Sequence, residues 1–112
     1  MTSYNLINGI HAANCYDICT QAARNEWGFA GVIMTDWTTT MHPGGSIPWK
    51  CIAAGNDIIM PGDTVDEVSI REAAASGELS ETVIRESAER IINMILRTNS
   101  YKDAEPYGKI LQ

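Results

Sequence analysis

The sequence predicts an α/β fold with a parallel sheet, because short apolar segments of strand type alternate with segments of helical periodicity. The apolar runs are nearly continuous and rich in β-branched residues, as is typical of strands buried on both faces. The predicted order is β-α-β-α-β-α-α. A length of 112 residues is enough for one small domain with its own core. In such sheets, functional side chains gather at the carboxyl ends of the strands.

The first predicted strand and helix occupy the first quarter of the chain. Residues 1–7 form a short segment that enters a polar stretch at Asn8, as a strand end running into a loop does. Over residues 14–27, apolar side chains recur at helical spacing, and Gly28 follows as a stop signal. We expect an amphipathic helix there.

Two further strands flank a loop and a short helix. Residues 31–35 are an apolar, β-branched run, and residues 57–60 repeat that pattern. Between them, residues 38–45 are rich in Thr, Gly and Pro and predict a loop. Residues 46–54 predict a short helix that Gly55 ends.

The last two predicted elements are helices with recognisable start signals. Thr64 and Glu67 match a capping box, in which each side chain bonds the backbone of the other residue. Ser80 is the expected N-cap of the final helix, which carries apolar residues along one face. Residues 99–112 turn polar and are expected to form a surface tail.

Composition and charge argue against several classes of protein. The net charge is -6, from 8 basic and 14 acidic residues, and the basic residues are scattered, so we expect no nucleic-acid partner. Neither an apolar run of about 20 residues nor a signal-type start is present, so we expect no membrane association and a cytoplasmic location, although a longer parent protein could differ. The three cysteines include no CxxC pair and predict free thiols, without a metal site or cofactor.

Asp36 is the leading candidate for chemistry, because it directly follows the apolar run at 31–35. At the end of a strand, its carboxylate is suited to be a nucleophile, a general base or a metal ligand. The alternative is an N-cap or turn residue at a strand exit. Trp37 adds a flat apolar surface of the kind that packs on a sugar ring, although aromatic residues also fill cores.

Ordered motifs run along most of the chain. They are MTSYN at 1–5, NG at 8–9, EWGF at 26–29, GVIMTDW at 31–37, AG at 54–55, MPG at 60–62 and GELS at 77–80. Together they resemble the β-glucosidases of glycoside hydrolase family 3. The resemblance implies that residues 1–98 are the C-terminal portion of the family's catalytic barrel domain, a partial (β/α) barrel fragment.

The resemblance also implies an activity and four site residues. The activity is retaining hydrolysis of terminal, non-reducing β-D-glucosyl residues of a β-glucoside or oligosaccharide, through a covalent glycosyl-aspartate. Asp36 matches the nucleophile, whereas Met1, Tyr4 and Trp37 match positions that line the subsite for the terminal sugar. We expect the Tyr4 hydroxyl to hydrogen-bond the nucleophile or the sugar.

A complete barrel of this type needs about 250 residues, and this chain supplies about three of its eight strands. The acid/base carboxyl of the family usually comes from a second, sandwich domain. We therefore expect the isolated chain to be inactive and to self-associate through unpaired strand edges. We also expect it to be the carboxyl end of an enzyme with reversed domain order. The alternative is a stand-alone, non-catalytic flavodoxin-like module. An ion pair between Asp36 and Lys50 or Arg24 would favour this alternative.

Overall fold

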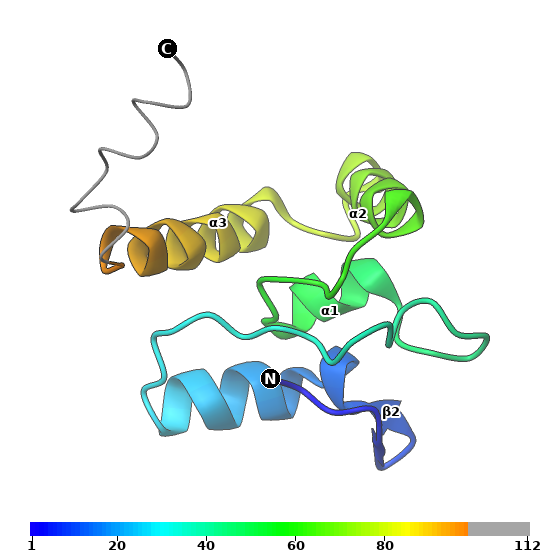
Figure 1. Cartoon of the computed structure of the whole chain (residues 1–112), viewed down its shortest axis with the longest axis horizontal. Helices are drawn as coiled ribbons and strands as arrows, with labels where there is room; N and C mark the ends of the chain where they lie inside the picture. The colour runs from blue at the N-terminus through cyan, green and yellow to red at the C-terminus, as the bar shows by residue number, and fades with distance from the viewer. Residues whose placement is uncertain (99–112) are drawn as a thin grey trace.

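The computed structural model describes residues 1–98, so the tail expected at 99–112 lies outside the described part of the chain. Seven elements follow one another within residues 1–98: β1 (Leu6–Ile7), β2 (Ile10–His11), the 3-10 helix η1 (Ala12–Asn14), the π-helix η2 (Asp17–Glu26), α1 (Pro48–Ala54), α2 (Thr64–Ser76) and α3 (Glu81–Leu96). Helix α1 lies at the centre and contacts η1, η2, α2 and α3 (Figure 1). The fold is α/β, with one small antiparallel sheet.

Strands β1 and β2 form a hairpin where the sequence predicted a strand end running into a loop. Ile7 pairs with Ile10 across a two-residue turn. Both turn residues have positive φ, 50° at Asn8 and 84° at Gly9, as a type I′ turn requires. Asn-Gly is a strong signal for this turn and would have predicted the hairpin.

The parallel sheet predicted from residues 31–35 and 57–60 is not found in the described residues. The two segments share a single parallel bridge between Met34 and Ile58. Backbone hydrogen bonds from Asp57 to Ile33 (2.7 Å), from Thr35 to Ile58 (2.9 Å) and from Thr2 to Met34 (2.9 Å) accompany it. Parallel pairs are slightly less stable per residue than antiparallel ones, and short strands need several neighbours to form a regular sheet. The segments therefore lie side by side without forming regular strands.

The predicted helices are present, but three starts differ from the prediction: η2 begins at Asp17, α1 begins at Pro48 and the cap of α2 is Asp63. The helix expected at 14–27 is η2, and the predicted end of α1 at Gly55 is confirmed. The predicted cap of α3 is confirmed as well, since the Ser80 hydroxyl accepts from the Val83 amide at 3.3 Å.

The capping box predicted at Thr64 and Glu67 is wrong by one position. Asp63 is the N-cap of α2, and its carboxylate accepts from the amides of Val65 (2.8 Å) and Asp66 (3.0 Å). The buried Asp66 side chain accepts in turn from the Asp63 amide. Asp is a better N-cap than Thr, so the helix starts from the residue that offers the stronger acceptor.

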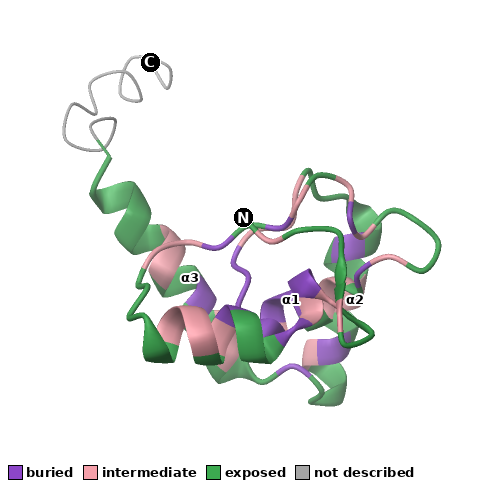
Figure 2. Cartoon of the chain, turned by 90° about the horizontal axis from the view of Figure 1, so that it is seen from below, coloured by how far each residue is buried: buried purple, intermediate pink, exposed green. Residues whose placement is uncertain are grey.

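The apolar core lies among α1, α2 and α3. Its buried residues are Ile52, Ala73 and Leu79, and partly buried side chains such as Trp49 and Val83 pack against them. Figure 2 shows buried residues concentrated along α1, while much of the outer surface of α2 and α3 is exposed. Because this cluster is small, buried polar contacts must contribute to holding the elements together.

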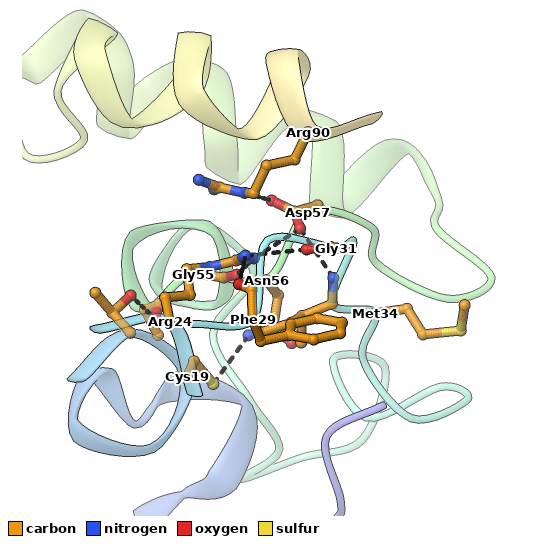
Figure 3. Close-up of polar contacts among 12 residues, drawn as sticks. Cys19, Arg24, Phe29, Gly31, Met34, Gly55, Asn56, Asp57 and Arg90 are labelled. Atoms are coloured by element: carbon orange, nitrogen blue, oxygen red, sulfur yellow. Dashed lines mark hydrogen bonds and ion pairs between the residues drawn. The ribbon is translucent and has the colours of Figure 1, made fainter. Parts of the chain in front are cut away.

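Asp57 is the centre of a buried ionic cluster that joins η2 to α3 (Figure 3). The Asp57 side chain is 0% exposed. Its Oδ2 accepts from Arg24 at 2.8 Å and from the Ile33 amide at 2.9 Å. Its Oδ1 accepts from Arg90 at 2.8 Å. Burial lowers the pKa of Arg24, and the Asp57 charge opposes that shift. The cluster therefore connects both helices to the segment that leads to Asp36.

Cys51 makes the stability of the chain sensitive to alkaline pH. Its thiol is fully buried, and burial raises its pKa from 9.0 to about 12. Above pH 9 the unfolded thiol loses its proton while the folded thiol keeps it, so the free energy of unfolding falls until the pH reaches the folded pKa. The expected slope from this group is at most about 1.4 kcal/mol per pH unit.

Urea unfolding at pH 7.5, 9 and 10.5, followed by circular dichroism, checks this expectation. Cys51→Ala removes the titrating group and should flatten the alkaline decline, because the other alkaline titrations are common to both proteins. Equal slopes for the two proteins above pH 9 would contradict it.

Candidate active site

The backbone that leads to Asp36 is held firmly by its neighbour segment. Thr35 is fully buried, and its amide donates to the Ile58 carbonyl at 2.9 Å. Its hydroxyl accepts from the Met60 amide at 2.9 Å. Asp36 therefore lies at the carboxyl end of the 31–35 segment, directly after a residue whose backbone is fixed by hydrogen bonds, as the positioning of a functional side chain requires.

The Asp36 carboxylate is half-buried and has no counterion among residues 1–98. Its Oδ1 accepts from the Trp37 amide at 2.7 Å. Arg24 binds Asp57 instead, and Lys50 forms no ion pair within the described residues. The local pairing that would favour a non-catalytic module is therefore not formed.

The structure brings Tyr4 beside the Asp36-Trp37 pair. The Tyr4 hydroxyl donates to the backbone carbonyl of Trp37, and not to the Asp36 carboxylate. The Trp37 side chain is 56% exposed and free to contact a ligand. Met1 is 80% exposed and lines a groove that Tyr4, Asp36 and Trp37 do not line. Three of the four predicted site residues therefore lie together, and Met1 lies apart from them.

The loop that follows Trp37 is fixed at both ends. Thr38 has a φ of 59°, which is unusual for a β-branched residue and costs about 1–3 kcal/mol. Its amide donates to the Met60 carbonyl at 2.8 Å, and its hydroxyl lies 3.2 Å from His42 Nε2. At the other end, the Ser46 amide donates to the Thr39 carbonyl at 2.9 Å. The sequence predicted this loop but not its closure.

A groove of about 640 Å³ lies beside the first residues and η2, away from Asp36. Ile18, Trp27 and Phe29 are among its apolar lining residues, and no carboxylate lines it. Tyr4, Asp36 and Trp37 are not part of it. Because the glycoside hydrolysis expected from the sequence uses carboxylates, we interpret the groove as a packing surface and not as the site of that chemistry.

No cluster of three or more His, Cys, Asp or Glu side chains in residues 1–98 is arranged to hold a metal ion. None of the helices in this range combines the length and apolar character needed to cross a bilayer.

Sequence comparison gives relatives over nearly the whole chain. The family model described as "Glycosyl hydrolase family 3 N terminal domain" matches residues 1–94. The chain is 34% identical over 96 residues to a probable beta-glucosidase I of Aspergillus flavus, an alignment that covers 85% of this chain and 11% of the relative. It is 31% identical over 107 residues to an exo-alpha-(1->6)-L-arabinopyranosidase of Bifidobacterium breve, covering 96% and 13%.

Structural comparison gives the same group of enzymes. Beta-glucosidase 3B from Thermotoga neapolitana, solved in complex with glycerol, superposes with a TM-score of 0.74 at 30% identity and covers 86% of this chain. A beta-glucosidase involved in saponin metabolism from intestinal bacteria shares the fold, with a TM-score of 0.74 at 24% identity over 90% of this chain. This chain spans 14% of each of these two structures.

Proposed function

The chain belongs to glycosyl hydrolase family 3, and on that premise we propose that it is the nucleophile-bearing, C-terminal part of the barrel domain of a retaining β-glucosidase, with Asp36 as the nucleophile. The observation that carries the proposal is the placement of Asp36 at the end of the 31–35 segment, without a counterion in residues 1–98 and next to Tyr4 and Trp37. The β-glucosidase relatives and structures support the activity.

The proposed mechanism follows from how the carboxylate is held. The Trp37 amide binds Oδ1 of Asp36, and no described residue hydrogen-bonds Oδ2, which is left to attack the anomeric carbon. As the new C–O bond forms, the glycosidic C–O bond breaks and the leaving oxygen takes a proton from an acid elsewhere in the protein. Water then gives a proton to the conjugate base of that acid and attacks the anomeric carbon, which breaks the bond to Asp36 and releases the sugar and the carboxylate.

The proposed substrate is a β-glucoside or oligosaccharide with a terminal glucosyl unit. The exposed Trp37 indole offers an apolar face for the sugar ring, and Tyr4 holds the backbone of that residue. Beta-glucosidase 3B has also been solved in complex with alpha-D-glucose, which supports a sugar ligand. For Met1, the proposed sugar contact is supported by the family resemblance alone.

The isolated chain is proposed to be inactive. It spans 11% of the Aspergillus relative and 14% of the Thermotoga structure, and its two barrel-type segments share one parallel bridge. The second carboxyl of a retaining site lies about 5 Å from the nucleophile, and in this proposal another part of the protein supplies it.

A chimera tests the function directly. Residues 1–94 replace the matching segment of beta-glucosidase 3B from Thermotoga neapolitana, and hydrolysis of p-nitrophenyl β-D-glucoside is measured. We expect hydrolysis by the chimera and none by the 112-residue chain. A folded chimera that binds glucose without hydrolysing the substrate would count against the proposed function.

The exposed apolar groove is proposed to drive self-association of the isolated chain. Trp27 at its rim is 75% exposed, and such surface seeks a partner. Light scattering over a concentration series should show dimers or larger species that Trp27→Glu dissociates. Trp37→Glu is the matched control, since Trp37 lies outside the groove and its change should leave association intact. A monodisperse wild-type monomer would contradict the expectation.

A further inference from the structure

His11 connects the β-hairpin to the loop that follows the candidate nucleophile. Its Nε2 lies 2.7 Å from the Gly44 carbonyl oxygen, and its Nδ1 lies 3.4 Å from the Tyr4 carbonyl oxygen. Both partners are acceptors, so the ring must donate. A neutral ring carries one N–H, and the tautomer protonated at Nε2 makes the shorter bond, to Gly44.

These contacts join the first residues of the chain to both ends of the loop that follows Trp37. Tyr4 is held by its hydroxyl, which donates to the Trp37 carbonyl, while its own carbonyl oxygen lies 3.4 Å from Nδ1 of His11. Trp37 begins the loop, and Gly44 lies near the end of that loop. His11 therefore holds the far end of the loop, while Tyr4 holds its beginning.

The loop itself is packed tightly enough to transmit this restraint. A Cβ atom at Gly45 would lie 2.2 Å from the Thr39 carbonyl oxygen, so the two arms of the loop are in close contact. The hydroxyls of Thr39 and Ser46 are buried and lie 3.0 Å apart. Because the arms are joined in this way, the position of Gly44 is coupled to the arm that follows Trp37.

We propose that His11 is a positioning residue for the sugar subsite: by holding Gly44, it keeps residues 38–46 against the hairpin and so sets the position of the Trp37 indole. His11 acts through the loop and hydrogen-bonds neither Asp36 nor the Trp37 side chain. The role in sugar binding rests on the proposed function, whereas the restraint on the loop does not.

Nuclear magnetic resonance of the 112-residue chain tests the restraint. In His11→Ala, we expect the indole N–H signal of Trp37, assigned with Trp37→Phe, to shift or broaden. The signals of Trp27 and Trp49 should stay in place and show that the chain is folded. His11→Gln retains a donor near the Nε2 position and should restore the Trp37 signal, whereas His11→Asn should behave like His11→Ala. An unchanged Trp37 signal in His11→Ala and His11→Asn would overturn the inference.

Kinetics of the chimera test the consequence for sugar binding. A displaced indole weakens contacts made equally in the ground and transition states, so His11→Ala should raise KM about tenfold with little change in kcat. His11→Gln should restore KM. An unchanged KM in a chimera whose Asp36 is covalently labelled by an activated 2-fluoroglucoside would overturn the role of His11 and leave the proposed function standing. A folded but inactive parent chimera would instead contradict the proposed function. The nuclear magnetic resonance experiment would still test whether His11 restrains the loop.

Discussion

Asp36→Asn is expected to abolish glycoside hydrolysis by the active chimera, with a loss of roughly 10⁴–10⁶-fold in kcat, as found when other enzymes lose their nucleophile. An amide oxygen is a much weaker nucleophile than a carboxylate, so the glycosyl-enzyme does not form. The change is nearly isosteric, and the Asn carbonyl can still accept from the Trp37 amide that binds Oδ1 of Asp36. The loss therefore reports chemistry and not a local rearrangement.

Covalent trapping identifies the nucleophile independently of rate. An activated 2-fluoroglucoside should label the peptide that contains Asp36, and the label should be absent from Asp36→Asn. Asp17→Asn is the control, because Asp17 is exposed on η2 and forms no ion pair within residues 1–98. A label on another carboxylate, with activity retained in Asp36→Asn, would remove Asp36 from the mechanism.

Asp57→Asn is expected to destabilise the chain by about 3–5 kcal/mol, as does the removal of one partner from other buried ion pairs. The change leaves the guanidinium groups of Arg24 and Arg90, which are 11% and 18% exposed, without their shared anion. Small domains have a total stability of about 5–15 kcal/mol, so this loss is a large part of it. Urea unfolding followed by circular dichroism measures the change.

A surface ion pair is the matched control for Asp57. Glu81 and Arg85 are bonded at 2.6 Å on α3, and both side chains are 76% exposed. Glu81→Gln removes the same charge as Asp57→Asn and should cost at most about 0.5 kcal/mol. In Asp57→Asn/Arg90→Met, removal of one of the two like charges should recover part of the stability. Equal costs for Asp57→Asn and Glu81→Gln would show that the buried cluster does not support the fold.

Local signals predicted much of this chain. Periodicity and caps gave the helices, and the ends at Gly55 and Ser80 are confirmed because a helix terminus depends on residues within one turn. The hairpin at Asn8-Gly9 was also predictable from its turn signal and was missed. The start of α2 was misplaced by one residue, although the higher N-cap preference of Asp over Thr would have favoured Asp63.

By itself, the sequence determined the family through ordered motifs, and it placed Asp36 at the end of an apolar segment. Only the tertiary structure decided which charges meet, since Asp57 joins Arg24 and Arg90, each 33 residues away, and leaves Asp36 without a counterion in residues 1–98. Caps and turns depend on neighbours in sequence, whereas ion pairs and parallel strand pairing depend on segments that meet only after folding. That is why the helices were predictable, while the Asp57 cluster and the His11 contact to Gly44 were not.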